Sequence, residues 1–325
     1  MKKAIAALLM ALLVAAMVPA GAEEAIQVDP DLPEYEAVEG VSGNLNSMGS
    51  DTLNNLMALW SEGFRRVYPN VNIQVEGKGS GTAPVALIAG TAQLGPMSRA
   101  MRDSEIDEFE DTYGFPPLEV SVGIDTLAVY VHKDNPTEGL SFEELDAIFS
   151  STRNSGYPEE ITTWGQVGLT GPWANRPMRL YGRNSASGTY AYFKDVALFR
   201  GDFKDTVNEQ PGSASVVQGV TEDINGIGYS GIGYRTSGVK AIALGVEKGD
   251  PHFEPTYENV VSGDYPLSRM LYIYVSKNPT QPMDTLTKEF LKFVLSKEGQ
   301  EIVARDGFLP LPAAVAESII EKLEG

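Results

Sequence analysis

The chain has 325 residues, with 25 Lys and Arg, 44 Asp and Glu, two His and no Cys. Its formal net charge of −19 excludes sequence-independent binding to nucleic acid, which needs clustered basic side chains. The same charge disfavours binding to an anionic membrane surface. The absence of Cys excludes thiol catalysis, thiolate metal sites, iron–sulfur clusters and disulfides. The length predicts about two domains, and a hydrophobic content of 42% is that of ordinary globular protein.

The first 22 residues have the pattern of a secretory signal peptide. A basic start at Lys2 and Lys3 is followed by an apolar run from residue 4 to 18 and by a small-residue cleavage site ending at Ala22. The run is shorter than the ~20 residues of a typical membrane span, and no Cys follows the cleavage site, which excludes a lipid-anchored form. We therefore expect an exported protein, cleaved after Ala22, with no later stretch able to cross a bilayer.

Strand and helix patterns alternate after a loose polar lead-in over residues 23–41. A glycine-containing turn at 49–52 runs into apolar residues with helical spacing over 53–67, and Pro69 closes that helix. Further on we expect a strand over 71–75, a helix over 84–89, a strand over 93–97 and an acidic helix near 104–111. This alternation is typical of an α/β layer fold.

Two apolar strands with the same ending lie far apart in the chain. Residues 127–136 and 271–279 each end in Lys and then Asn-Pro, where the chain must leave the strand. They are either two similar strand exits, the simpler interpretation, or two strands that cross between domains, out near residue 131 and back near 273. Further elements are expected as a helix capped by Ser141 with Glu144 three residues on, a strand over 178–181, and helices over 190–199, 286–295 and 297–304.

Hydroxyl side chains with a glycine or another small residue mark three predicted helix starts. These are Ser50-Asp51-Thr52, Ser80-Gly81-Thr82 and Ser187-Gly188-Thr189. Free backbone N–H groups and the helix dipole at such a start favour a bound oxyanion, although each segment alone is more simply an ordinary N-cap. Arg183 precedes the third segment and supplies a permanently charged fork. The three helix starts and Arg183 together predict a site that binds an oxyanion. Local dipoles and one buried Arg would hold the anion there, although the net negative charge of the protein repels it.

An ordered set of short motifs resembles the periplasmic phosphate-binding proteins of ABC transporters. The motifs are GSDT (49–52), GKGSGT (77–82), GPMSR (95–99), RNSASGT (183–189), GIGYSGIGY (226–234), YPLSRMLYIYV (265–275) and DGFLPLP (306–312). The resemblance implies an α/β, two-domain periplasmic-binding-protein fold with mixed sheets, helices on both faces and two crossing hinge strands. It gives the repeated Lys–Asn–Pro segments the hinge role, with a discontinuous first domain over 23–130 plus 275–325 and a second over 131–274.

The same resemblance implies a periplasmic protein that captures inorganic phosphate in the cleft between the domains. It would deliver the phosphate to the membrane permease subunits of an ABC transporter. The family's phosphate contacts fall, residue by residue, on Thr52, the Leu53 backbone N–H, Ser80, Arg183, Ser187, Gly188 and Thr189.

One position departs from the family pattern. Counted from Ser80, the Asp that commonly accepts the proton of hydrogen phosphate is replaced by Ser98. A carboxylate acceptor rejects sulfate, which has no proton to give, whereas a serine hydroxyl can donate or accept. We therefore expect looser discrimination against sulfate, unless Asp51 is the proton acceptor.

Enzyme signatures are missing from the sequence. There is no G-x-S-x-G or H-E-x-x-H motif, and the glycine-rich segments 77–82 and 182–189 lack the Gly-Lys-Ser/Thr ending of a P-loop. His132 is expected at a strand exit and His252 in a loop. We expect no catalytic residue, metal or cofactor, and a monomer. A weak phosphatase on the same fold and a secreted phosphate-binding matrix or adhesion protein stay open as alternatives.

Overall fold

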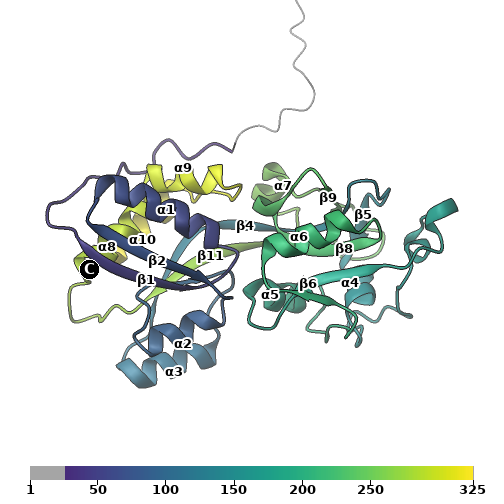
Figure 1. Ribbon diagram of the computed structural model, residues 1–325, viewed down its shortest axis with the longest axis horizontal. Coiled ribbons are helices and arrows are strands. Elements are labelled where there is room, and N and C mark those ends of the chain that lie inside the picture. The colour runs from purple at the N-terminus through teal and green to yellow at the C-terminus, as the bar shows by residue number, and fades with distance from the viewer. Residues whose placement is uncertain (1–25, 325) are drawn as a thin grey trace, which may run out of the picture.

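The structure, a computed structural model, describes residues 26–324, so the predicted signal peptide over 1–22 lies outside the described residues. Two lobes lie side by side and share the long strands β4 (Leu118–His132) and β11 (Ser268–Val275) (Figure 1). The chain builds most of the first lobe, forms the second between β4 and β11, and returns to the first. The first lobe is therefore discontinuous in sequence.

Parallel strands β1 (Gly43–Gly49) and β2 (Val71–Gly77), joined by helix α1 (Asn54–Val67), form one part of the first lobe. Its other elements are α2 (Thr82–Ile88), β3 (Gly95–Met97), α3 (Asp103–Tyr113), α8 (Thr285–Leu295), α9 (Lys297–Arg305) and α10 (Ala313–Glu324). Helix α1 buries Leu56, Trp60 and Phe64, which recur every fourth residue and so share one face. This face packs into a core shared with α8 and α9.

The second lobe is built around β6 (Arg179–Arg183), β7 (Asn208–Gln210) and β8 (Gly226–Gly231), and β8 pairs in parallel with β6 and antiparallel with β4. Its other elements are β5 (Gly139–Ser141), α4 (Phe142–Phe149), α5 (Gly188–Val196), α6 (Ser213–Glu222), η3 (Ile232–Tyr234), β9 (Val239–Ala241), β10 (Ala243–Gly245), α7 (Tyr257–Ser262) and two 3-10 turns at Trp164–Val167 and Gly171–Trp173. The predicted cap of α4 is confirmed, because the Ser141 hydroxyl accepts from the Glu144 N–H and the Glu144 carboxylate accepts from the Ser141 N–H.

One mixed sheet runs through both lobes in the order β3-β11-β4-β8-β6-β7, with β9 beside the far end of β4. β4 and β11 are antiparallel neighbours, and helices cover the sheet in each lobe (Figure 1). The predicted α/β fold with mixed sheets and two crossing strands is confirmed. Of the two interpretations of the repeated strand pattern, the structure supports strands that cross.

The change from one hydrophobic core to the other locates the crossing along these strands. On β4, Val122 packs in the first core and Leu127 in the second. On the returning segment, Leu267 packs in the second core and Leu271 in the first. We propose the domain limits at these changes of core, earlier along both strands than the expected limits at 130–131 and 274–275. The Lys–Asn–Pro segments follow the outer ends of the strands, in opposite lobes, and not the crossing itself.

Candidate functional site

The turn after β1 contributes hydroxyl groups from the first lobe. Ser50 and Thr52 are buried, at 2% and 1% exposure. The Ser50 hydroxyl accepts from the Thr52 backbone N–H at 3.2 Å and donates to Ser98 Oγ at 2.9 Å. Leu53, the N-cap position of α1, places its side chain in the first core, so only its backbone is available to the cleft.

Ser80 and Ser98 lie against each other and are completely buried. The Ser98 backbone N–H donates to Ser80 Oγ at 3.0 Å, and the two hydroxyl oxygens are 3.3 Å apart. Because Ser98 Oγ already accepts from Ser50, its own proton is available to be donated. This position thus carries a neutral hydroxyl, whose single proton is left for Ser80 Oγ or for a ligand.

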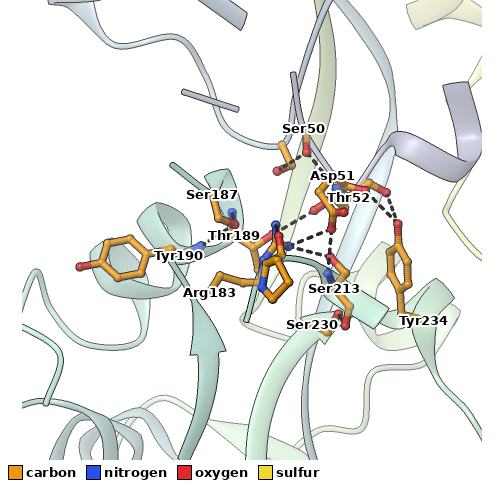
Figure 2. Close-up of polar contacts among 12 residues, drawn as sticks. Ser50, Asp51, Thr52, Arg183, Ser187, Thr189, Tyr190, Ser213, Ser230 and Tyr234 are labelled. Carbon is orange, nitrogen blue, oxygen red and sulfur yellow. Dashed lines mark hydrogen bonds and ion pairs between the residues drawn. The ribbon is translucent and has the colours of Figure 1, made fainter. Parts of the chain in front are cut away.

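From the second lobe comes the N-terminus of α5. Ser187 is its N-cap, and its hydroxyl accepts from the backbone N–H groups of Thr189 and Tyr190 at 3.1 and 3.3 Å (Figure 2). Gly188 and Thr189 form the first two helical positions. The ordinary N-cap interpretation is therefore correct for Ser187, whereas Ser50 and Ser80 use their hydroxyls to hold neighbouring segments and leave α1 and α2 without side-chain caps.

Arg183 is the last residue of β6 and is 2% exposed. Its Nη1 donates to Ser213 Oγ at 2.8 Å and lies 3.2 Å from Asp51 Oδ2 in the first lobe (Figure 2). Its Nη2 donates to the Pro211 carbonyl oxygen at 3.3 Å. Its Nε is buried and has no hydrogen-bond partner within residues 26–324. Burial lowers the pKa of Arg183, and the Asp51 carboxylate opposes that shift.

Contacts between the lobes close the cleft over these groups. Thr52 Oγ1 and Thr189 Oγ1 are 3.0 Å apart, and the Ser213 N–H donates to Asp51 Oδ2 at 2.7 Å. The Tyr234 hydroxyl of η3 donates to the carbonyl oxygens of Asp51 and Thr52 at 2.9 and 3.1 Å (Figure 2). Burial raises the pKa of Tyr234, so this hydroxyl stays protonated and able to donate.

All the residues proposed from the sequence therefore gather where the two lobes meet. Thr52, Ser80 and Ser98 approach from one side, and the α5 start with Arg183 approaches from the other. The sequence did not predict the hydrogen bonds and ion pairs that hold the site residues in place, which involve Ser50, Ser213, Tyr234, Asp125 and Arg269. The sequence feature that pointed to them was that most of these residues lie within or beside the quoted motifs.

The chemistry of this set is that of a site for an oxyanion. Buried hydroxyls, a helix start and an arginine offer hydrogen-bond donors and positive charge at positions shielded from solvent. Within residues 26–324 no cluster of three His, Cys, Asp or Glu could hold a metal ion. His132 ends β4 opposite Val239, and His252 lies beside Gly139 and Gly245, so both belong to the second lobe away from the α5 start.

Residues 35–298 match a family model described as a PBP superfamily domain. The chain belongs to this superfamily. It is 56% identical over 316 residues to the phosphate-binding protein PstS of Pseudomonas aeruginosa, a match that covers 97% of this chain and 98% of that protein. It is also 30% identical to protein SphX of Synechococcus elongatus, over 82% of this chain and 77% of that protein. Within the superfamily the chain therefore belongs to the PstS family.

Solved structures agree with this family assignment. A putative phosphate ABC transporter substrate-binding protein with bound phosphate from Clostridium perfringens matches with a TM-score of 0.69 and 25% identity, over 83% of this chain and all (100%) of that one. An ABC-type phosphate transport receptor from Vibrio cholerae matches with a TM-score of 0.64 and 25% identity, over 82% and 100%. The resemblance inferred from the motifs is confirmed. No helix in the described part of the chain is both long and apolar enough to cross a membrane.

Proposed function

We propose that this protein binds inorganic phosphate between its two lobes and delivers it to an ABC transporter. The observation that carries the proposal is the buried, unpartnered Nε of Arg183, a residue that lies where the two lobes meet, together with buried hydroxyls and the start of α5. An uncompensated buried N–H is costly, and an oxyanion is the partner that would satisfy it. The family membership supports the same ligand, since the relatives are named for phosphate.

The proposed contacts are those expected from the sequence. Thr52, the Leu53 N–H, Ser80 and Ser98 would bind phosphate from the first lobe, and Arg183, Ser187, Gly188 and Thr189 would bind it from the second. A ligand that contacts both lobes favours the closed arrangement through these differential contacts. Micromolar affinity corresponds to about −8 kcal/mol, which several charge-assisted hydrogen bonds can supply.

Calorimetric titration of the mature chain, stripped of bound anion, tests this function. We expect one tightly bound phosphate per chain, no phosphomonoesterase turnover, and a smaller radius of gyration by small-angle scattering when phosphate is added. An absence of phosphate binding would refute the proposal. A robust phosphatase rate would favour the enzymatic alternative instead.

The remaining parts of the proposal concern cellular context. We infer export through a signal peptide over 1–22, a periplasmic location, delivery to the permease subunits, and a monomer without a cofactor. Relatives named as binding proteins support a non-enzymatic role. A secreted matrix or adhesion role would use the same phosphate site. Loss of phosphate uptake on deletion of the gene, restored by the wild-type protein, would distinguish transport from that role.

Selectivity between phosphate and sulfate should depend on Ser98 and Asp51. Ser98 carries a neutral hydroxyl, so it presents no carboxylate charge against a fully ionised oxyanion. Phosphate and sulfate are nearly equal in size, so shape discriminates poorly between them. We predict measurable sulfate binding by the wild type, and at least about a hundredfold loss of sulfate affinity relative to phosphate in Ser98→Asp, because like charges in a desolvated site repel strongly.

The competing account assigns the acceptor role to Asp51. Its Oδ2 forms an ion pair with Arg183 Nη1 and accepts a hydrogen bond from the Ser213 N–H, which would orient the carboxylate at the edge of the site. In that case the wild type would ignore excess sulfate, and Asp51→Asn would admit it. Competition titrations on the wild type, Ser98→Asp and Asp51→Asn separate the two accounts. Strong sulfate rejection by all three proteins would contradict both.

A further inference from the structure

A second buried arginine lies where the strands cross between the lobes. Arg269 on β11 is the direct cross-strand neighbour of Asp125 on β4, and the two residues are 6% and 0% exposed. Arg269 donates to Asp125 Oδ2 from Nε at 3.0 Å and from Nη2 at 2.7 Å. Asp125 falls between Val122 and Leu127, and Arg269 falls between Leu267 and Leu271, where the chain changes from one core to the other. The ion pair thus lies where β4 and β11 cross between the lobes.

Arg269 also contacts the candidate binding site directly. Its Nη2 donates to Thr189 Oγ1 at 2.9 Å, and Thr189 Oγ1 is in turn 3.0 Å from Thr52 Oγ1 in the other lobe. The guanidinium group lies 5.3 Å from the ring centroid of Tyr192, on the same helix as Thr189. Arg269 is therefore held by the crossing strands on one side and bonded to the α5 start on the other.

The bond from Arg269 fixes the direction in which Thr189 can hydrogen-bond. A threonine hydroxyl has one proton and two lone pairs. Arginine can only donate, so the contact occupies a lone pair of Thr189 Oγ1 and leaves the proton for another partner. An oxyanion accepts hydrogen bonds from such a proton. In the closed arrangement Thr52 Oγ1, 3.0 Å away, is the other partner of this hydroxyl, and an anion between the lobes would receive the proton in its place.

We propose that Arg269, anchored by Asp125 at the crossing, is a positioning residue that orients the Thr189 hydroxyl to donate to the bound anion. The inference rests on the proposed phosphate function and adds to it a residue that the motif comparison did not assign. Arg269 belongs to β11 and is hydrogen-bonded to Asp125 on β4. The orientation of the Thr189 hydroxyl therefore depends on the relative positions of these two strands at the crossing. The anion site and the hinge are coupled through this one side chain.

A double-mutant cycle between Arg269 and Thr189 tests the proposal, with phosphate affinity of the mature chain as the readout. In the wild type, Arg269→Gln should weaken phosphate binding about tenfold, the scale of one hydrogen bond to a charged group. In the Thr189→Val background, which has no hydroxyl to orient, the loss should shrink to about threefold or less, and this remainder measures the charge of Asp125 left without its cation. In the Thr189→Ser background, where a hydroxyl is restored, the full effect should return.

Equal losses in all three backgrounds would overturn the proposal. Such a result would mean that Arg269 acts on the anion directly, through its unpartnered Nη1, or only through the fold. Lys204→Gln is the matched control for the loss of a buried cation. Lys204 is 9% exposed, and its contacts within residues 26–324 are to the Ala147 and Ile161 carbonyl oxygens and to Glu160, all in the second lobe. Lys204→Gln should lower the melting temperature without changing phosphate affinity.

A replacement variant and a wild-type titration complete the test. If Arg269→Gln fails to fold, Arg269→Lys takes its place in the cycle, because Lys keeps the charge opposite Asp125 but lacks a second nitrogen for Thr189. The wild-type titration is run alongside every variant. Absence of phosphate binding by the wild type would refute the proposed function, whereas wild-type binding with no coupling in the cycle would refute this inference alone.

Discussion

Arg183→Ala and Arg183→Lys should both strongly reduce the affinity for phosphate. Removing a charged hydrogen-bond partner from a desolvated site costs roughly 2–5 kcal/mol, which corresponds to a loss of affinity of about thirtyfold or more. Lys cannot replace the guanidinium, because Nη1 and Nη2 are occupied by Ser213, Asp51 and Pro211 while Nε remains for the anion. Calorimetric titration measures the loss, and circular dichroism checks that each variant is folded.

A second substitution separates the two consequences of losing Arg183. In Arg183→Ala the Asp51 carboxylate keeps its bond from the Ser213 N–H but has no cation beside it, so it would repel an incoming anion. Asp51→Asn should therefore recover part of the affinity in the Arg183→Ala background, although it gains nothing by itself. Phosphate binding by Arg183→Lys at the wild-type affinity would show that Arg183 is not the anchor.

The sequence predicted the fold well because its local patterns agree with the tertiary structure. The fourth-residue recurrence of Leu56, Trp60 and Phe64 predicted α1, and the Ser141–Glu144 box predicted the start of α4. Local pattern could not decide whether the two Lys–Asn–Pro strands cross between the lobes. That choice depends on the antiparallel pairing of β4 with β11, whose partners lie more than a hundred residues apart. β1, α6 and α10 were not predicted as separate elements.

The candidate site was predictable as a set of residue types but not as a network of partners. Ser187 caps its own helix, a contact that local sequence can reveal. Ser80 instead receives the N–H of Ser98, 18 residues away, and Asp51 meets Ser213 across 162 residues. Asp125 and Arg269 are separated by 144 residues, and nothing near either position indicates the other. Long-range hydrogen bonds of this kind follow from strand register and lobe closure, which a single sequence does not specify.

Gly188→Ala should prevent the cleft from closing around phosphate. Gly188 begins α5, and a Cβ built on it would lie 2.2 Å from Ser80 Oγ, 2.7 Å from Ser98 Oγ and 2.9 Å from the Ser80 Cβ. Rotation of the hydroxyls cannot relieve all three contacts, so the lobes must separate. Ala is a better helix former than Gly, so the second lobe itself should fold normally. Overpacking of this size costs about 1–3 kcal/mol, and we expect phosphate affinity to fall by up to about a hundredfold.

The matched control for this prediction is Gly81→Ala at the same interface. A Cβ on Gly81 would meet its nearest neighbour, the Ala186 carbonyl oxygen, at 3.4 Å, which is an ordinary van der Waals distance. Its backbone N–H would still donate to that oxygen, so affinity should change by no more than about twofold. Small-angle scattering at saturating phosphate should give the closed radius of gyration for Gly81→Ala and a larger one for Gly188→Ala. Wild-type affinity and a closed radius in Gly188→Ala would mean that Ser80 and Ser98 stand further from α5 when phosphate is bound, and that the anion itself separates the two loops.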